Sequence, residues 1–281
     1  MPITRDRVRT YYEQNTELFI RFGNARRAQN IHRGLWTDGV RTVEEALNIS
    51  NERIRDEIEC VAPTHARVTD LGCGVGASLF HIFPRLAEPN LAIGVTLSPL
   101  QARLAGRAAK QMSFTERIDF VESDFTCLPL AAGCMDAAFA VEAVAHAIDP
   151  ESVFCEASRL LRTGGLWIVL DDYRVNRALT SAEEKWLDAF IHGWHVPGVI
   201  TTDQAETFAS RNRLRLIRND DFTPLLRLQN LPDTLARLLR FLGNHLPIQH
   251  AILPSMLGSM ALQQCLHDKI IEYRFLVFEK V

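Results

Sequence analysis

The pattern of apolar and polar positions changes near residue 66 of this chain. Before that point, apolar side chains recur at helical spacing. This predicts a helix within the first 22 residues and a second over 42–61, where Thr42 and Glu45 fit a capping box. From residue 66, short apolar runs alternate with helical stretches as far as residue 173. Such alternation predicts right-handed βαβ units and a mostly parallel sheet covered on both faces, hence an α/β fold.

The alternation is interrupted after residue 173. Residues 181–199 are rich in aromatic and histidine side chains, and a helix-then-strand pattern resumes over 203–217. A Leu-rich helical pattern follows over 231–246, and residues 273–280 indicate a final strand next to the one that ends the previous pattern. We expect this second half to add an insertion and the last strands to the sheet.

Composition excludes several functional classes. With 281 residues, 47% hydrophobic and 23% charged, the chain is long enough to bury a sizeable core. A net charge of −3 lacks the basic excess that is typical of nucleic-acid-binding proteins. No apolar run approaches the roughly 18 residues of a membrane span, so we expect no stable membrane insertion. The N-terminus has no apolar core of a secretory signal, and the six cysteines form no CxxC pair, which predicts reduced thiols and a cytoplasmic location.

The string VTDLGCGVG, residues 68–76, is an apolar strand that ends at Asp70 and runs through a glycine-rich turn into a helix. Glycines permit a tight turn and close approach of the backbone to a ligand, and the following helix N-terminus offers unpaired N–H groups. Because Ala77 also completes the dinucleotide pattern GxGxxA, an NAD-binding site is the first alternative to test.

Three features favour S-adenosylmethionine over NAD. Asp70 directly precedes the turn, where a carboxylate suits a cationic amine better than an anionic pyrophosphate. The next strand ends at Thr96 and not at the acidic residue that would bind an NAD ribose. Asp124 follows a later strand and is placed to accept a hydrogen bond from an adenine amino group.

These segments occur in the order and spacing of a known family. Together with GVTLSPLQ, SDFTCLPL and EASRLLRTGGLWIV, the glycine turn resembles the class I S-adenosylmethionine-dependent methyltransferases over most of residues 60–180. GVTLSPLQ and VEAVAHAID resemble the subgroup of sterol, tocopherol and terpenoid methyltransferases. The resemblance implies a Rossmann-like, doubly wound, seven-stranded sheet, mostly parallel with an antiparallel last strand. It also implies a helical N-terminal cap at 1–60, a cofactor-binding core at 61–180, and a lid insertion, acceptor-binding helices and the last core strands at 181–281.

The same resemblance implies a set of cofactor-binding residues. The methionine part is assigned to Asp70, Gly72, Gly74 and Gly76. The ribose is assigned to Thr96, Leu97 and Gln101, although Thr96 stands where the broader family has an acid, and the adenine to Asp124 and Phe125. Two residues of the N-terminal region are expected to close over the cofactor, Tyr12 and His32. The alternatives are that Tyr12 packs in the core and that His32 lies in a surface turn.

Glu142 and His146 lie four positions apart in the otherwise apolar string VEAVAHAID. In the implied fold this string is the turn after the fourth strand, at the sheet edge where ligands bind, so we expect both to be catalytic residues beside the reactive methyl group. One of them is expected to act as a general base for a hydroxyl, amine or activated carbon. With an alkene acceptor, a carboxylate and aromatic faces are expected to stabilise the carbocation, and a base to end the cascade. The alternative is that they pair with each other or cap a turn.

Aromatic and leucine residues concentrate in the regions expected to form the lid. They predict a lipophilic small-molecule acceptor such as a prenyl chain, although ordinary core packing is the alternative for each: Tyr11, Phe19, Phe22, Trp36, Trp186, Phe190, Trp194, Leu235, Leu238, Leu239 and Leu242. The leading hypothesis is C-methylation of a terpenoid alkene. The alternatives are O- or N-methylation, a non-methylating ligand-binding or cyclisation protein on the same fold, and an NAD oxidoreductase.

Other patterns are weaker. His192 and His195 lack a third ligand, so we expect no metal site. Asp171 and Asp172 are expected to follow the fifth strand, where metal-dependent catechol methyltransferases carry acidic ligands, which leaves Mg²⁺ as an alternative. The Leu-rich helix over 231–246, together with Arg227, Arg237 and Arg240, would suit a membrane surface. The amphipathic N-terminal helix would suit a homo-oligomer.

Overall fold

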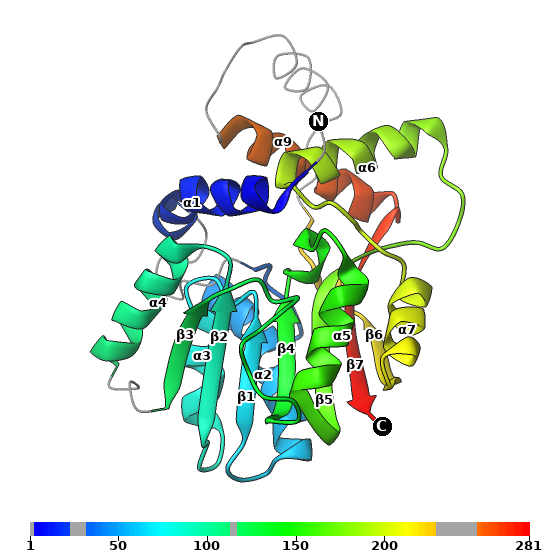
Figure 1. Ribbon diagram of the computed structural model, residues 1–281. Helices are drawn as coiled ribbons and strands as arrows, with labels where there is room; N and C mark the ends of the chain where they lie inside the picture. Colours follow the sequence, from blue (N-terminus) through cyan, green and yellow to red (C-terminus); the bar gives the residue numbers. More distant parts are fainter. Residues whose placement is uncertain (1–2, 23–31, 113–116, 229–251) are drawn as a thin grey trace.

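The computed structural model describes residues 3–22, 32–112, 117–228 and 252–281, without the side chains of 17–22 and 252–254. A seven-stranded sheet of order β3-β2-β1-β4-β5-β7-β6 forms the centre of the molecule (Figure 1). Strands β1 to β5 are parallel, and β7 is antiparallel to both β5 and β6. The expected α/β sheet with an antiparallel last strand is therefore confirmed. The strands are β1 Arg67–Leu71, β2 Leu91–Thr96, β3 Ile118–Glu122, β4 Met135–Val141, β5 Leu161–Arg174, β6 Leu214–Asp221 and β7 Ile271–Lys280.

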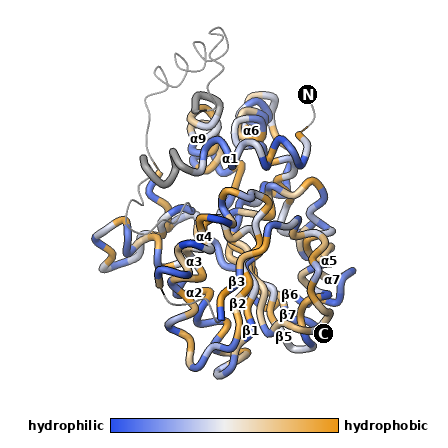
Figure 2. The backbone as a smooth tube through the Cα atoms, turned by 60° about the vertical axis from the view of Figure 1, so that its left-hand side comes forward, coloured by the Kyte–Doolittle hydropathy of each residue, from blue (hydrophilic) through white to orange (hydrophobic). Residues whose placement is uncertain are grey.

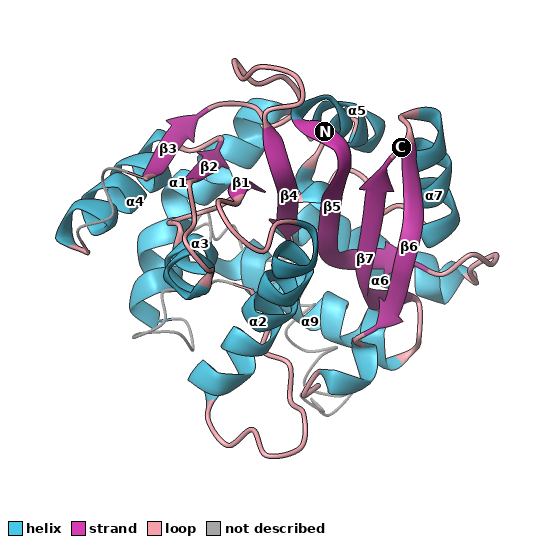
Figure 3. Ribbon diagram, turned by 90° about the horizontal axis from the view of Figure 1, so that it is seen from below, coloured by secondary structure: helices cyan, strands magenta, loops and turns pink. Residues whose placement is uncertain are grey.

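Helices cover both faces of the sheet (Figure 3). Helices α2 (Val43–Val61), α3 (Ala77–Ile82) and α4 (Pro99–Gln111) lie on one face, and α5 (Pro150–Leu160) and α7 (Thr202–Arg211) on the other. Central strands such as β4 are apolar almost throughout because both of their faces are buried. Short 3₁₀ helices occur at η1 Phe83–Arg85, η2 Val144–His146 and η3 Thr223–Leu225.

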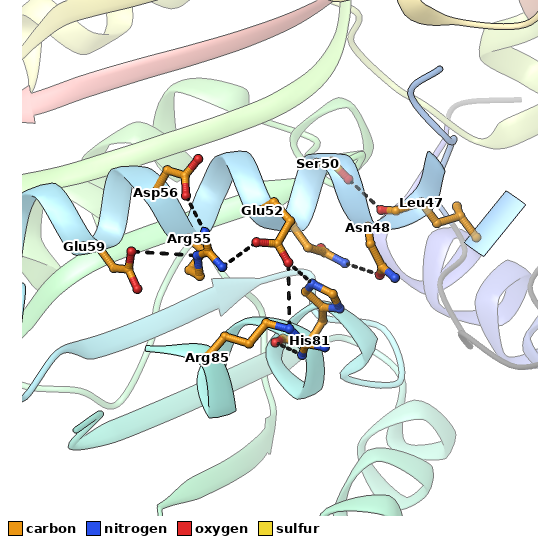
Figure 4. Close-up of polar contacts among 10 residues, drawn as sticks. Leu47, Asn48, Ser50, Glu52, Arg55, Asp56, Glu59, His81 and Arg85 are labelled. Atoms are coloured by element: carbon orange, nitrogen blue, oxygen red, sulfur yellow. Dashed lines mark hydrogen bonds and ion pairs between the residues drawn. The ribbon is translucent and has the colours of Figure 1, made fainter. Parts of the chain in front are cut away.

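Helix α2 belongs to the layer that packs on the sheet, although all of it but Val61 lies in the region 1–60 that was expected to form a cap. Its buried Ile54 and Ile58 join the same core cluster as Phe139 of β4. On its outer side Glu52 accepts a hydrogen bond of 2.6 Å from His81 Nε2 of α3, as Figure 4 shows. The capping box of Thr42 and Glu45 at its N-terminus is confirmed.

Three helices lie together over the carboxyl edge of the parallel strands: α1 (Arg5–Phe22), α6 (Ser181–Trp194) and α9 (Ile252–His267) (Figures 1 and 2). Helices α6 and α9 cross closely, since a Cβ at Gly258 would lie 2.6 Å from the Trp194 ring. Helix α9 was not predicted because its apolar residues lie on all sides and show no helical periodicity. The predicted helix over 231–246 lies outside the described residues.

Strand β5 differs from the expectation at both ends. It begins at Leu161, immediately after α5, whereas the helical stretch of the alternating pattern at this point, ESVFCEASRLLRTGG, extends over residues 151–165. It also continues to Arg174, because pairing with β7 extends as far as Ile271. Asp171 and Asp172 therefore lie within the strand, and the expectation that they follow it is wrong.

Candidate active site

A cavity of about 450 Å³ lies between the carboxyl edge of the sheet and helices α1, α6 and α9. It is lined by twelve of the thirteen residues predicted for the site, drawn from α1, the turns after β1, β2, β3 and β4, and the segment before α2: Tyr12, His32, Asp70, Gly72, Gly74, Thr96, Leu97, Gln101, Asp124, Phe125, Glu142 and His146. The remaining residue, Gly76, is not among the residues that line it.

The three glycines of the turn all have positive φ angles, of 97°, 55° and 86° in chain order, and serve different purposes. A Cβ at Gly72 would lie 2.4 Å from Ala143 Cβ, whereas one at Gly74 would meet nothing within 4 Å, so Gly74 leaves the backbone open to a ligand. A Cβ at Gly76 would lie 2.6 Å from the Phe120 ring. Gly76 therefore packs against Phe120, and its expected position against the methionine part of a cofactor stays a prediction.

Asp70 is a buried carboxylate at the end of β1. Within the described part of the chain, its oxygens make no hydrogen bond or ion pair, and burial raises its pKa well above the ordinary value. Such a group is stabilised when a cation reaches it. The ammonium group of S-adenosylmethionine fits this position, and the open backbone at Gly74 fits the rest of its amino-acid end.

The residues predicted for the ribose are joined to helix α1. The Thr96 hydroxyl donates to Gln101 Oε1 over 2.7 Å, and the Gln101 amide donates to the Thr16 hydroxyl over 3.0 Å. The Asp124 carboxylate accepts from the Thr126 backbone N–H and hydroxyl, and its other oxygen lies 2.7 Å from Arg5 Nε of α1. Gln101 and Asp124 thus bind side chains of α1 and also line the cavity.

Glu142 is held as an anion by residues that the sequence analysis did not select. Its Oε1 accepts from the Arg33 backbone N–H at 2.9 Å, from Arg33 Nε at 3.1 Å and from the Tyr273 hydroxyl at 2.8 Å. Burial alone would raise its pKa, but Arg33 and these hydrogen bonds leave it below the ordinary value. The alternative that Glu142 and His146 bond to each other is wrong, since each has other partners.

Arg33 also joins Glu142 to Asp172. Its Nη2 lies 2.8 Å from Asp172 Oδ1, and its guanidinium lies 4.0 Å from the centre of the Tyr273 ring. Burial still raises the pKa of Asp172 to about 6, although Arg33 opposes the shift. The adjacency of Arg33 to His32 was the available sequence signal; Tyr273, on the last strand, offered none.

His146 is held by hydrogen bonds on both ring nitrogens. Nδ1 lies 3.3 Å from the His195 carbonyl, which can only accept, so Nδ1 carries the proton and Nε2 accepts from the Tyr12 hydroxyl at 2.7 Å. Burial lowers the pKa of His146 to about 4 and raises that of Tyr12, so both are uncharged near neutral pH. The hydrogen bond from Tyr12 to His146, called the latch below, thereby holds α1 against the turn after β4.

His32 presents a free acceptor to the cavity. Its Nδ1 lies 3.1 Å from the Arg33 carbonyl and so carries the ring proton, and burial lowers its pKa, which keeps the ring neutral. Its buried Nε2 has no hydrogen-bond partner among the residues that the structure describes. A buried acceptor of this kind suits a donor on a ligand.

The aromatic residues divide between the cavity and the core. The cavity is lined by Tyr11, Phe190 and Trp194, whereas Trp186 packs between α6 and α9. The Arg227 guanidinium lies over Trp36, 3.4 Å from the centre of the Trp36 ring. The side chains of Phe19, Phe22, Leu235, Leu238, Leu239 and Leu242 lie outside the described residues. Within the described ranges, no three His, Cys, Asp or Glu side chains are grouped to hold a metal ion, and no helix is long and apolar enough to cross a membrane.

Residues 69–169 match the family model described as a methyltransferase domain. This is an S-adenosylmethionine-dependent methyltransferase domain. The choice left by the GxGxxA string thus falls on S-adenosylmethionine, the cofactor of this family. The domain contains the glycine turn, Asp124, Glu142 and His146.

Two curated relatives come from distant organisms. The 24-methylenesterol C-methyltransferase 2 of Oryza sativa subsp. japonica is 26% identical over 185 residues, which cover 64% of this chain and 49% of the relative. The 27-O-demethylrifamycin SV methyltransferase of Amycolatopsis mediterranei (strain S699) is 31% identical over 141 residues, which cover 49% of each chain. The chain therefore spans about half the length of these relatives.

The fold also matches a solved methyltransferase structure. Geranyl diphosphate methyltransferase in complex with GPP and sinefungin superposes with a TM-score of 0.77 and 19% identity, over 99% of each chain. At this identity the likeness establishes the fold alone.

Proposed function

We propose that the whole chain transfers the methyl group of S-adenosylmethionine to a lipophilic small-molecule acceptor. The observation that carries the proposal is the buried Asp70 carboxylate, without a cation among the described residues, beside a glycine turn whose backbone faces the cavity. An anion in this position favours a ligand that brings an ammonium and a sulfonium charge.

The cofactor-binding residues follow from this placement. Asp70, Gly72 and Gly74 are assigned to the amino-acid end, Thr96, Leu97 and Gln101 to the ribose, and Asp124 and Phe125 to the adenine. Tyr12 and His32 cover the cavity from the N-terminal region. When bound, S-adenosylmethionine supplies an electrophilic methyl group, and the protein's contribution is to bind, to orient and to exclude water.

The finer proposal is C-methylation of a terpenoid alkene, such as the geranyl group of an indole alkaloid, followed by cyclisation. It is supported by the aromatic faces of Tyr11, Phe190 and Trp194 at the cavity and by the anionic Glu142. Aromatic faces and a fixed carboxylate both stabilise a cationic carbon. Glu142 acts as that fixed charge, and His146 is a positioning residue that acts through Tyr12.

The second candidate is O- or N-methylation of a natural product. It is favoured by the similarity to the 27-O-demethylrifamycin SV methyltransferase. That similarity covers 49% of the relative, the same share as for the sterol enzyme. The two candidates share the cofactor site and differ in the acceptor atom.

The deciding experiment uses methyl-deuterated S-adenosylmethionine with a panel of prenylated indoles, sterols and phenols, read by mass spectrometry and then NMR. Label on a prenyl carbon, with a new ring, supports C-methylation and cyclisation. Label on oxygen or nitrogen contradicts it and establishes the second candidate. Binding of S-adenosylhomocysteine without labelling of any acceptor would instead favour a non-methylating protein.

The cofactor site is tested separately by Asp70→Asn. Removing the carboxylate charge is expected to weaken S-adenosylhomocysteine binding about 10- to 100-fold in calorimetry, because a charged hydrogen bond contributes about 1.5–3 kcal/mol. Asp119→Asn, at an exposed position on β3, is the matched control and should bind as the wild type does. Equal affinities for all three proteins would refute the assignment of Asp70.

A further inference from the structure

Asp171 is a buried carboxylate at the cavity, near the end of β5. Its Oδ1 accepts from the Asp172 backbone N–H at 2.8 Å, and its Oδ2 accepts from the Ala145 backbone N–H at 3.2 Å. These two bonds fix the plane of the carboxylate and leave each oxygen a further lone pair. No ion pair to Asp171 occurs among the residues that the structure describes.

Apart from Asp70 and His32, which are assigned to the cofactor, the other candidate bases around the cavity are engaged. Glu142 forms an ion pair with Arg33 and accepts from Tyr273, and Asp172 pairs with the same arginine. The Nε2 of His146 accepts from Tyr12. When one of these groups takes up a proton, it loses an ion pair or a hydrogen bond. Protonation of Asp171 breaks no ion pair with the described residues.

The groups around Asp171 favour its protonation. Burial and the charges of Asp172 and Glu142 raise its pKa to about 7. Tyr12 of α1 and Tyr173 of β5 also face it. On the adjacent elements, Arg274 of β7 is its register partner but bonds to Glu272 and Asn219, and Cys265 of α9 lies near Asp172. A base with a pKa near the working pH transfers protons most effectively.

We propose that Asp171 is a further catalytic residue, the base that takes up the proton which the acceptor releases. The proposal rests on the proposed methyl transfer. With an alkene acceptor, a C–H bond beside the cationic carbon breaks, its electron pair forms a C=C bond, and the proton passes to a carboxylate oxygen of Asp171. With a hydroxyl or amine acceptor, the O–H or N–H bond breaks and the electron pair stays on the heteroatom. The carboxyl group returns the proton to solvent after each turnover.

The kinetic test compares Asp171→Asn with Asp172→Asn, using the acceptor found by the deuterium-label assay. Asp171→Asn is expected to lower kcat by about 10²- to 10⁴-fold, the usual contribution of a general base, and to abolish the rise of kcat/KM near pH 7. Its affinity for S-adenosylhomocysteine should stay within about threefold of wild type. Asp172→Asn keeps the Asp171 carboxylate but removes the partner of Arg33 and a charge that raises the pKa of Asp171, so it should retain a rise of kcat/KM, displaced to lower pH.

A rescue experiment guards against misfolding of the isosteric variant. Asp171→Ala should regain activity when formate is added, because formate restores a carboxylate in the vacated space. Wild-type kcat and pH profile in Asp171→Asn, or a parallel loss of S-adenosylhomocysteine affinity, would overturn the proposal. Activity that depends on added Mg²⁺, with weaker Mg²⁺ binding in Asp171→Asn, would also overturn it and make Asp171 a metal ligand.

A measurement without an acceptor separates this proposal from the proposed function. Infrared spectra of the protein with S-adenosylhomocysteine, recorded from pH 5 to 9, should show a buried carboxyl group that titrates near neutral pH, persists in Asp172→Asn and is absent in Asp171→Asn. Its absence from the wild type would refute the assignment of Asp171 even if methyl transfer is established. Failure of every acceptor to be labelled would refute only the proposed function.

Discussion

At the scale of the residue, the site depends on how buried charges are matched. Arg33 is the cation that Glu142 and Asp172 share, and both carboxylates are nearly enclosed by protein. Asp70 and Asp171 have no such partner among the described side chains. The four carboxylates therefore divide into two whose charge the protein balances and two that are left for a ligand or a proton.

Replacing Arg33 tests the first group. Arg33→Met should lower the free energy of unfolding by about 3–5 kcal/mol, because it leaves Glu142 and Asp172 buried without a cation. Urea unfolding at pH 7 measures the difference. The loss should shrink as the pH falls towards 4: without Arg33 the folded-state pKa of each carboxyl lies above its unfolded value, so protonation relieves the cost. Arg227→Met, at the exposed arginine over Trp36, should change stability by less than about 1 kcal/mol, and an equal loss there would contradict the explanation.

At the scale of the element, α1 is a helix whose partners are site residues. Arg5 pairs with Asp124, Tyr12 donates to His146, and Thr16 accepts from Gln101. Farther from the sheet, the Tyr11 hydroxyl lies 3.0 Å from the Ser255 hydroxyl of α9. Because α1 covers the cavity through these contacts, its position is coupled to the residues assigned to the cofactor and to catalysis.

The latch between Tyr12 and His146 predicts a pH dependence of α1. The folded-state pKa of His146, about 4, lies below its ordinary value of 6.5, so the stability it contributes is complete above pH 6.5 and is lost as the pH falls towards 4. Protonation removes the acceptor for the Tyr12 hydroxyl. Hydrogen exchange of α1, corrected for intrinsic rates, should therefore quicken between pH 6 and 4.

Tyr12→Phe is the control for this dependence. It removes the hydrogen bond at every pH and should cost about 0.5–1.5 kcal/mol at pH 7. Exchange in α1 of this variant should be faster than in the wild type at pH 7, and the difference should diminish towards pH 4. A difference that stays constant from pH 7 to 4 would show that the latch does not depend on His146.

At the scale of the whole molecule, one sheet carries the site and the helices that cover it. The turns after β1, β2, β3 and β4 open on the same edge, and α1, α6 and α9 close over it (Figure 1). A ligand bound between them contacts the sheet edge and the covering helices together. Binding should therefore stabilise both parts.

The expected stabilisation follows from mass action. At a concentration one hundred times its Kd, S-adenosylhomocysteine should add about 2.7 kcal/mol to the free energy of unfolding and slow hydrogen exchange in α1 as well as in β1 and β4. NADH at the same concentration should change neither. Stabilisation by NADH would restore the dinucleotide alternative, and protection confined to the strands would show that α1 does not close over the ligand.

The sequence by itself determined the features that depend on neighbouring residues. The alternation of strands and helices, the capping box of Thr42 and Glu45, and the turn that follows Asp70 are all set by residues a few positions apart. Helix α9 and the length of β5 escaped prediction, because one lacks periodicity and the other is extended by pairing with β7. The local sequence pattern therefore predicts neither of these two features.

Only the tertiary structure decided the protonation and the partners of the site. Glu142 meets Arg33 across 109 positions and Tyr273 across 131, and His146 meets Tyr12 across 134. Glu142 and His146, four positions apart, prove to have separate partners. Asp171 and Asp172 are adjacent in sequence but differ in their partners. Asp172 pairs with Arg33, whereas Asp171 has no cation beside it among the described residues. Charge and desolvation act through space, so a pattern of nearby residues identifies which groups reach the cavity but not which of them hold a proton there.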